Sequence, residues 1–121
     1  MNKDIDIIIY GATGFTGQLC VKYFQSLETI VKWAIAGRNT EKLNKVAADN
    51  QTAVEILVAD ADDEFALDKL TSRAKVILST AGPFHRYGSK LVASCIKNNS
   101  HYVDITGAVS YTHLTLPTSY A

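Results

Sequence analysis

The sequence contains little of several features that mark whole classes of protein. Its 121 residues include only two prolines and two cysteines, and Cys20 and Cys95 stand 75 positions apart. A collagen-like chain is therefore excluded, and neither a disulfide framework nor a cysteine-rich metal cluster is expected. Charge of one sign is not in excess either, because twelve lysines and arginines balance twelve aspartates and glutamates. A protein that binds nucleic acid through its phosphates usually has a basic excess, so no nucleic-acid partner is expected.

Long hydrophobic runs are missing as well. Uninterrupted apolar segments such as residues 7–10 are only a few residues long, whereas a membrane-spanning helix needs about 20. The first residues lead directly into a strand-like pattern, without the features of a signal peptide. Hydrophobic residues nevertheless make up 47% of the sequence and charged residues 20%, which favours a folded core over a disordered chain. We expect a soluble, cytoplasmic protein with one globular domain and no membrane span.

Short apolar segments alternate with segments of helical periodicity along residues 5–105. This alternation predicts βαβ units, right-handed crossovers and a parallel sheet. The expected fold class is therefore α/β, a Rossmann-like doubly wound parallel sheet with strand order 3-2-1-4-5. The five expected strands are residues 5–10, 32–36, 53–58, 75–80 and 101–105.

Four amphipathic helices are expected between these strands. The second should begin at Asn39 or Thr40, either of which is a good N-cap, and the third should be capped by Asp62. The fourth should follow a loop at residues 81–88. The candidate inward-facing residues, in chain order, are Leu19, Cys20, Tyr23, Phe24 and Leu27; Leu43, Val46 and Ala47; Phe65, Leu67 and Leu70; and Leu91, Val92, Cys95 and Ile96.

A glycine-rich turn follows the first expected strand at once. Its residues are Gly11, Ala12, Thr13, Gly14, Phe15, Thr16 and Gly17, and the first helix begins inside it. Glycine at this spacing allows a tight turn, close approach of the backbone to a pyrophosphate and close packing of the helix on the sheet. The helix N-terminus then presents free N–H groups and a partial positive charge to the phosphates. All seven residues are predicted to bind a dinucleotide; a turn with a purely structural role is the alternative.

The residue after the second strand indicates which dinucleotide is bound. An NAD site usually has a carboxylate there, which binds the ribose 2′-hydroxyl, but this sequence has Arg38. A guanidinium group can bind a 2′-phosphate through two hydrogen bonds, and Asn39 can add another. The pattern favours NADP over NAD as the cofactor; a merely solvated arginine is the alternative.

Two further strand ends are expected to contact the cofactor, because ligands of this fold bind beyond the carboxyl ends of the strands. Asp60 ends the third strand, where its carboxylate can accept hydrogen bonds from the adenine. Ala81, Gly82 and Pro83 follow the fourth strand and are expected beside the nicotinamide ribose, with an ordinary turn as the alternative. The neighbouring acids Asp62 and Asp63 are ascribed to helix capping and solvation, so no metal site is expected.

No catalytic residue can be assigned from the sequence. Hydride transfer is the chemistry of the cofactor, so the protein must supply substrate binding and a proton source. Short-chain dehydrogenases use a tyrosine followed by lysine four positions later, and none of the six tyrosines has such a lysine. Cys20 and Cys95 are expected to be inert packing residues, and His101 is expected to be structural. The remaining polar candidates near the expected site are His85, Arg86, Tyr87, Asp104 and Thr106.

Five segments together resemble the N-terminal NADP-binding domain of the saccharopine dehydrogenase-like oxidoreductases, a group that includes proteins called trans-acting enoyl reductases. The segments are residues 10–17, 33–39, 57–63, 79–88 and 102–107. The strings Ala-Gly-Pro-Phe-x-x-Tyr-Gly and Tyr-Val-Asp-Ile-Thr-Gly are the most specific of them. The resemblance covers residues 5–107 and implies a Rossmann domain followed by a larger second domain that shapes the substrate site.

The sequence departs from the family pattern after Gly107, where the family continues into a glutamate and a long second domain. Residues 108–121 contain no lysine, arginine, aspartate or glutamate, and Pro117 argues against a central strand. We expect residues 1–107 to form an NAD(P)-binding Rossmann domain. We expect residues 108–121 to be an unstructured or non-native tail, with the substrate domain absent; a native extension of the sheet edge is the alternative.

Two functions are compatible with the resemblance. The first is the NADP-binding domain of an oxidoreductase that transfers hydride between the nicotinamide cofactor and an unidentified organic substrate. The small-molecule substrate would then bind with the help of the missing domain, and this chain alone would be inactive. The alternative is a non-catalytic NADP-binding sensor or interaction module.

Overall fold

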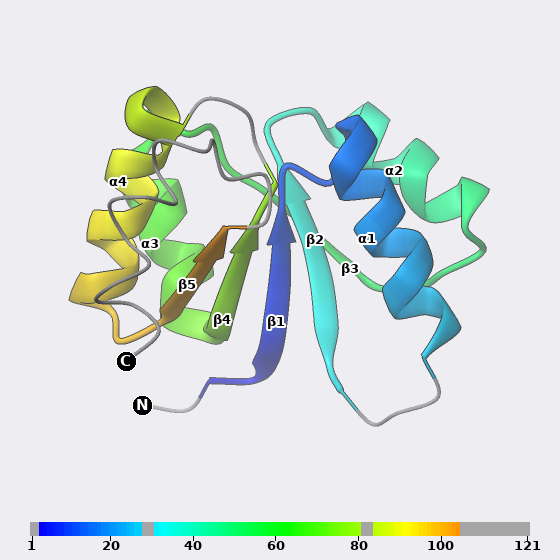
Figure 1. The fold of residues 1–121 in the computed structure, drawn as a ribbon, viewed down its shortest axis with the longest axis horizontal. Helices are drawn as coiled ribbons and strands as arrows, with labels where there is room; N and C mark the ends of the chain where they lie inside the picture. Colours follow the sequence, from blue (N-terminus) through cyan, green and yellow to red (C-terminus); the bar gives the residue numbers. More distant parts are fainter. Residues whose placement is uncertain (1–2, 28–30, 81–83, 105–121) are drawn as a thin grey trace.

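A computed structural model describes residues 3–27, 31–80 and 84–104, with the segment 84–89 described by its backbone alone. Figure 1 shows a single sheet with helices on both of its faces. The strand order is β3-β2-β1-β4-β5 and every neighbouring pair is parallel, which confirms the predicted fold class. The strands are β1 Ile5–Tyr10, β2 Trp33–Gly37, β3 Glu55–Val58, β4 Ala74–Ser79 and β5 His101–Asp104, and the helices are α1 Phe15–Ser26, α2 Thr40–Asp49, α3 Glu64–Arg73 and α4 Phe84–Lys97.

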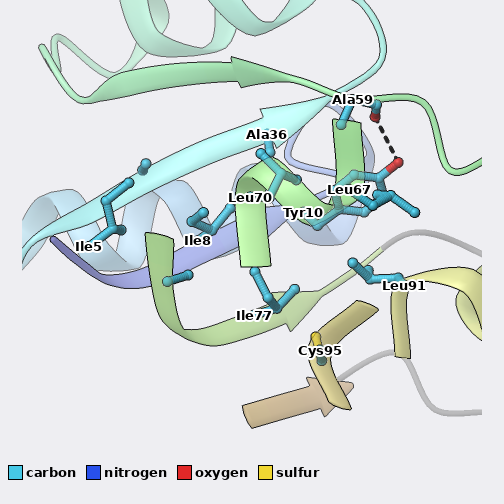
Figure 2. Packing of buried hydrophobic residues seen from close by; sticks show 12 residues of the cluster. Ile5, Ile8, Tyr10, Ala36, Ala59, Leu67, Leu70, Ile77, Leu91 and Cys95 are labelled. Atoms are coloured by element: carbon cyan, nitrogen blue, oxygen red, sulfur yellow. Dashed lines mark hydrogen bonds between the residues drawn. The ribbon is translucent and has the colours of Figure 1, made fainter. Parts of the chain in front are cut away.

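The central strand β1 is buried on both faces of the sheet. Ile8 and Ile9 are both fully buried, although successive strand residues point to opposite faces. Ile8 belongs to the core beneath α3 and α4, and Ile9 to the core beneath α1 and α2. Figure 2 shows the first of these two cores. The near-continuous apolar sequence of β1 is thus explained by two helices on each face of a parallel sheet.

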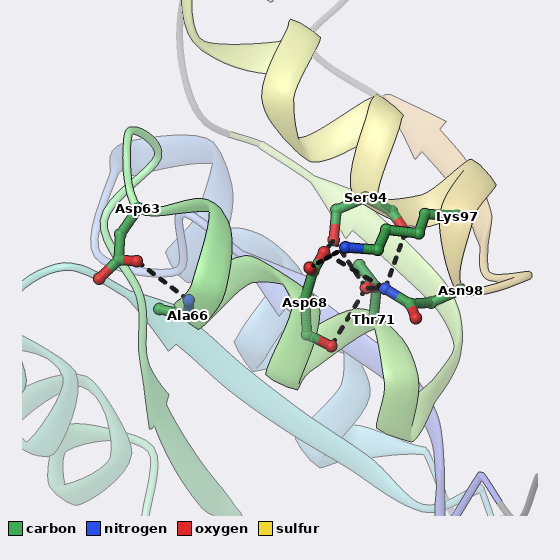
Figure 3. Close-up of polar contacts among 7 residues, drawn as sticks. All are labelled: Asp63, Ala66, Asp68, Thr71, Ser94, Lys97 and Asn98. Atoms are coloured by element: carbon green, nitrogen blue, oxygen red, sulfur yellow. Dashed lines mark hydrogen bonds and ion pairs between the residues drawn. The ribbon is translucent and has the colours of Figure 1, made fainter.

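The caps of α2 and α3 show how the chain enters its helices from the sheet. The side chain of Asn39 accepts a hydrogen bond from the backbone N–H of Lys42 at 3.0 Å, as expected. The cap of α3 is Asp63, whose carboxylate accepts from the N–H of Ala66 at 3.1 Å (Figure 3). The prediction of Asp62 was wrong by one residue: Asp62 belongs to the preceding turn, where its N–H donates to the Asp60 carboxylate, and the helix begins at Glu64.

The inward face of α1 was predicted only in part. Leu19 and Tyr23 were expected to be buried but are 51% and 62% exposed. The residues of α1 that are buried are Gly17 and Val21, and Phe24 is half-buried. Close packing at Gly17 turns that side of the helix toward the sheet. Leu19 is two positions further along, roughly 200° around the helix axis, and therefore faces away.

Helix α4 begins earlier than predicted. Residues 84–88 were expected in a loop, but α4 starts at Phe84. Glycine at position 88 favoured a loop, yet a glycine inside a helix costs only about 1 kcal/mol relative to alanine. Two apolar candidates also face outward, since Phe65 of α3 is 72% exposed and Ile96 of α4 is 74% exposed. Leu67, Leu70, Leu91 and Cys95 form the buried faces of these helices.

A polar network joins α3 to α4 where these two helices pack against each other (Figure 3). The hydroxyl groups of Thr71 and Ser94 lie 2.8 Å apart, and Ser94 donates to the carboxylate of Asp68 at 2.6 Å. Lys97 forms an ion pair with the same carboxylate at 2.7 Å. The hydrogen bonds from Lys97 and Ser94 hold the pKa of Asp68 below its usual range. The network therefore satisfies polar groups where the two helices meet.

The lowered pKa of Asp68 predicts an acid-sensitive contribution to stability. Folding lowers this pKa below its ordinary value of 3.8, so the contribution is complete above that pH and is lost as the pH falls through the folded-state pKa. Chemical denaturation should show that Asp68→Asn destabilises the protein near pH 6 but much less near pH 3. An equal loss of stability at both pH values would contradict this account of the network.

Candidate functional site

Parallel strands end together along one edge of the sheet, the upper edge in Figure 1. Gly11, Arg38, Ala59 and Thr80 are the first residues after β1, β2, β3 and β4. The chain proceeds from β1 to β2 and β3 on one side and then returns to β4 on the other side of β1. The order of the strands thus reverses between β1 and β4, and ligands of open α/β sheets bind at such a switch point.

The glycine turn after β1 is tied to the sheet by its backbone. Gly11 has a φ of 85°, in the left-handed region that favours glycine. Its N–H donates to the carbonyl oxygen of Ala36 in β2 at 2.9 Å, and the N–H of Gly14 donates to the Gly11 carbonyl at 3.2 Å. Helix α1 begins at Phe15, and no side chain caps its first turn. The first N–H groups of α1 are therefore available to an anionic ligand.

Gly17 and Gly14 have different physical reasons to be glycine. A Cβ atom at Gly17 would lie 2.7 Å from the Cα of Ala12 and would also collide with the carbonyl oxygen of Gly11. A Cβ at Gly14 would meet that same oxygen at 3.6 Å, which is an ordinary contact. Gly17 is thus required by packing between α1 and the turn. Gly14 is exposed, and nothing within the described part of the chain needs glycine there.

The other predicted turn residues lie at the same edge of the sheet. Ala12 is fully buried and packs in the core beneath α1 and α2. Thr13 and Thr16 are half-buried, and the carbonyl of Thr13 accepts a hydrogen bond from the Gln18 side chain at 2.8 Å. Phe15 is 81% exposed. The structure therefore places the seven predicted residues together, the first four in the turn after β1 and the last three in the first turn of α1.

Arg38 and Asn39 follow the second strand, as predicted. Arg38 is exposed and follows the buried Gly37 directly. Within the described ranges the ion pairs involve other cations, so the guanidinium of Arg38 is available to a ligand. The side-chain oxygen of Asn39 already caps α2. Arg38 is therefore the stronger of the two candidates for binding a phosphate group.

Asp60 lies one residue beyond Ala59 and is exposed. Its carboxylate accepts a hydrogen bond from the N–H of Asp62 at 2.9 Å, and its carbonyl accepts from the N–H of Asp63 at 2.9 Å. Both Asp60 and Arg38 influence the pKa of Tyr10 at the end of β1. Burial and, to a smaller extent, the charge of Asp60 raise that pKa to about 12 against the opposing charge of Arg38. The two charged candidates thus lie near the Tyr10 hydroxyl, both on the side of β1 where β2 and β3 lie.

Two hydroxyl groups at this edge were missed by the sequence reasoning. The Tyr10 hydroxyl donates to the carbonyl oxygen of Ala59 at 2.9 Å. The Thr80 hydroxyl lies 3.1 Å from the carbonyl oxygen of Tyr10 and 3.0 Å from that of Gly11. The available signals were weak: one polar atom on the tyrosine that ends a run of isoleucines, and one threonine after β4.

Several other candidates are placed only in part. Ala81, Gly82, Pro83 and Thr106 lie outside the described residues, as does the segment 108–121. The structure describes the backbone of residues 85–87 in the first turns of α4 but not their side chains. Asp104 ends β5, and its carboxylate lies 3.5 Å from the Tyr102 hydroxyl.

The two thiols have the properties of packing residues. Cys95 is 1% exposed, and burial raises its pKa to about 12. Cys20 is half-buried, and burial raises its pKa as well. Both thiols therefore stay protonated at neutral pH, and a nucleophilic thiolate is disfavoured.

Neither a membrane span nor a metal cluster is found in the part of the chain that the structure describes. None of its helices is long and apolar enough to cross a bilayer. No three side chains of histidine, cysteine, aspartate or glutamate gather within this part as metal ligands would.

Comparison with known sequences identifies relatives along almost the whole chain. Residues 7–120 match the family described as "Saccharopine dehydrogenase NADP binding domain". A trans-acting enoyl reductase of Mycobacterium leprae is 38% identical over 112 residues, which cover 90% of this chain and 27% of that protein. A trans-acting enoyl reductase of Mycobacterium ulcerans is 37% identical with the same coverage. The chain thus spans about a quarter of the length of these curated relatives.

Solved structures share the fold. The apo saccharopine dehydrogenase (L-Glu forming) of Saccharomyces cerevisiae has a TM-score of 0.72 at 19% identity, covering 91% of this chain and 24% of that one. A short-chain dehydrogenase/reductase of Veillonella parvula in complex with NADP has a TM-score of 0.67 at 17% identity, covering 96% of this chain and 58% of that one. At these identities the likeness demonstrates a common Rossmann-like fold and no more.

The family match extends over nearly all of the chain, including the glycine turn and the loops after β2, β3 and β4. It confirms the resemblance recognised in the sequence, and it confirms NADP as the cofactor. With a doubly wound parallel sheet and a glycine turn in the expected place, the chain belongs to the saccharopine dehydrogenase NADP-binding domain family.

Proposed function

We propose that this chain is the cofactor-binding part of an NADP-dependent oxidoreductase that transfers hydride to or from an organic substrate. The observation that carries the proposal is the packing of Gly17 against Ala12, closer than any other residue would allow. This packing aims the uncapped N-terminus of α1 along the carboxyl edge of the sheet. Backbone N–H groups arranged in this way suit a pyrophosphate.

Each predicted residue has a role in this proposal. The turn at residues 11–17 binds the pyrophosphate, and Gly14 is glycine so that the phosphates can approach its backbone. Arg38 binds the 2′-phosphate, supported by the turn that Asn39 caps. Asp60 accepts hydrogen bonds from the adenine. The segment 81–83, which follows β4 in the sequence, is proposed to contact the nicotinamide ribose, since ligands of this fold bind beyond the carboxyl ends of the strands.

The substrate class is suggested by the names of the relatives. The mycobacterial proteins are called enoyl reductases, and we extend this substrate class to the oxidoreductase proposed here. When bound, NADPH supplies a hydride for one carbon of the double bond, while a proton must reach the other. We propose that residues 1–107 form the cofactor domain, and that a separate domain of the longer protein binds the substrate and supplies the proton.

A non-catalytic NADP-binding module is the second candidate. It is favoured by the absence of any tyrosine with a lysine four positions later. Both candidates require the same cofactor site. They differ in turnover: an oxidoreductase containing this domain consumes NADPH when an α,β-unsaturated carbonyl compound is added, whereas a sensor does not.

The role of Arg38 predicts selective loss of NADPH binding. In calorimetric titrations of the 121-residue chain, Arg38→Ala should weaken NADPH binding by about 10-fold to 100-fold, since a hydrogen-bonded charge is lost. Binding of NADH should hardly change, because NADH has no 2′-phosphate. Lys45→Ala is the matched control, because Lys45 is an exposed cation on α2 paired with Asp49. Equal losses for both cofactors would remove Arg38 from the 2′-phosphate site.

The two glycines of the turn should respond differently to a methyl group. Gly17→Ala should lower the free energy of unfolding by about 1–3 kcal/mol, as overpacking does, and abolish NADPH binding. Gly14→Ala should leave the melting temperature almost unchanged, because its Cβ makes only an ordinary contact, but should weaken NADPH binding by obstructing the phosphates. Thermal melts and calorimetry of both variants test this, and full NADPH affinity in Gly14→Ala would contradict a phosphate at the turn.

A further inference from the structure

Two buried hydroxyl groups connect the loops of the proposed cofactor site. Tyr10 is 5% exposed and Thr80 is 6% exposed. We propose that both are positioning residues for NADP: Tyr10 holds the loop that carries Asp60, and Thr80 holds the glycine turn. This inference rests on the proposed function and adds two residues that lie outside the glycine pattern.

The Tyr10 side chain reaches across a neighbouring strand. Tyr10, Ala36 and Leu57 are register partners across β1, β2 and β3. Because β2 has only the small side chain of Ala36 at this level, the tyrosine ring can extend toward the end of β3. Figure 2 shows its hydroxyl bonded to the carbonyl of Ala59, a distance of 2.9 Å. A single side chain thus links the end of β1 to the loop after β3.

The backbone of Ala59 is held at both its N–H and its carbonyl group. Its N–H donates to the carbonyl of Gly37 at 2.8 Å, and its carbonyl accepts from Tyr10. The next residue, Asp60, begins a tight turn closed by the N–H groups of Asp62 and Asp63. The internal geometry of that turn is set locally, but its location relative to the glycine turn is set at Ala59. Together with the bond from the Ala59 N–H to Gly37, the Tyr10 hydroxyl therefore helps to set the distance between the adenine and pyrophosphate ends of the site.

On the opposite side of β1, Thr80 links the end of β4 to the glycine turn. Its N–H donates to the carbonyl of Tyr10 at 2.9 Å, and its hydroxyl is shared between the carbonyls of Tyr10 and Gly11. The Gly11 carbonyl also accepts the N–H of Gly14, the bond that closes the turn. The Thr80 hydroxyl therefore donates to the Gly11 carbonyl, the same group that accepts the hydrogen bond closing the proposed phosphate-binding turn.

Both hydroxyl groups are donors at neutral pH. Burial raises the pKa of Tyr10 to about 12, so its proton is retained, and a threonine hydroxyl does not ionise. Replacement by Phe or Val keeps the shape of the side chain and removes only the polar atom. These substitutions test the hydrogen bonds with little change in packing.

The experiment compares Tyr10→Phe, Thr80→Val and Thr80→Ser with the unmodified 121-residue chain. NADPH and adenosine 2′,5′-bisphosphate are titrated into each by calorimetry, and a melting curve is recorded for each. Tyr10→Phe and Thr80→Val should weaken binding of both ligands by about fivefold to tenfold, as expected for one lost hydrogen bond. Thr80→Ser keeps the hydroxyl and should restore most of the affinity.

Thr71→Val is the matched control for a purely structural effect. Thr71 is fully buried, and its hydroxyl belongs to the network between α3 and α4, away from the cofactor loops. This variant should lose stability but bind both ligands like the unmodified chain. If it loses affinity as much as Tyr10→Phe, the effect follows stability and the inference is overturned.

The remaining outcomes separate this inference from the proposed function. Unchanged affinity in both Tyr10→Phe and Thr80→Val, while the unmodified chain binds NADPH, overturns the inference and leaves the proposed function intact. Failure of the unmodified chain to bind either ligand overturns the proposed function itself, and the inference with it. If Tyr10→Phe does not fold, the comparison of Thr80→Val with Thr80→Ser decides.

Discussion

The contact between α1 and the turn before it is closer than any side chain would permit, and the architecture of the site depends on it. Gly17 lies directly against the backbone of Gly11 and Ala12. Helix α1 can therefore descend onto the sheet immediately after the turn, with its N-terminus at the carboxyl edge. The same contact sets the rotation of α1, which is why Val21 is buried while Leu19 and Tyr23 are exposed.

Small residues at the ends of β1 and β2 extend this principle. Ala12 and Ala36 are fully buried, and Gly37 is buried beside them. The N–H of Gly11 bonds the carbonyl of Ala36, so the pairing of β1 with β2 continues into the turn. The small side chain of Ala36 also leaves space for the ring of Tyr10, its register partner in β1. Close backbone approach and a few long-range hydrogen bonds thus hold loops that are distant in sequence.

The sequence predicts the architecture well because its signals are local and strong. The isoleucine-rich β1, the glycine spacing after it and the alternation of strands and helices identify the fold, the family and the place of the cofactor turn. Features that depend on tertiary packing were harder to predict from the sequence. Which face of α1 turns toward the sheet depends on the contact of Gly17 with Ala12. The cap of α3 is Asp63 because Asp62 belongs to the turn before the helix. The hydrogen bonds of Tyr10 and Thr80 join residues about 50 to 70 positions apart, and no local pattern encodes such pairs.

The central claim is that NADP binds along the carboxyl edge of this sheet, between the glycine turn and the loop after β3. It is tested most directly by titrating the isotope-labelled chain with NADPH and following the backbone amide signals by NMR. The account predicts that signals of residues 11–17, Arg38 and Asp60 shift in a saturable way, while those of Asp68 and Ser94 stay unchanged. Shifts confined to the α3–α4 side, or no shifts at saturating NADPH, would contradict it.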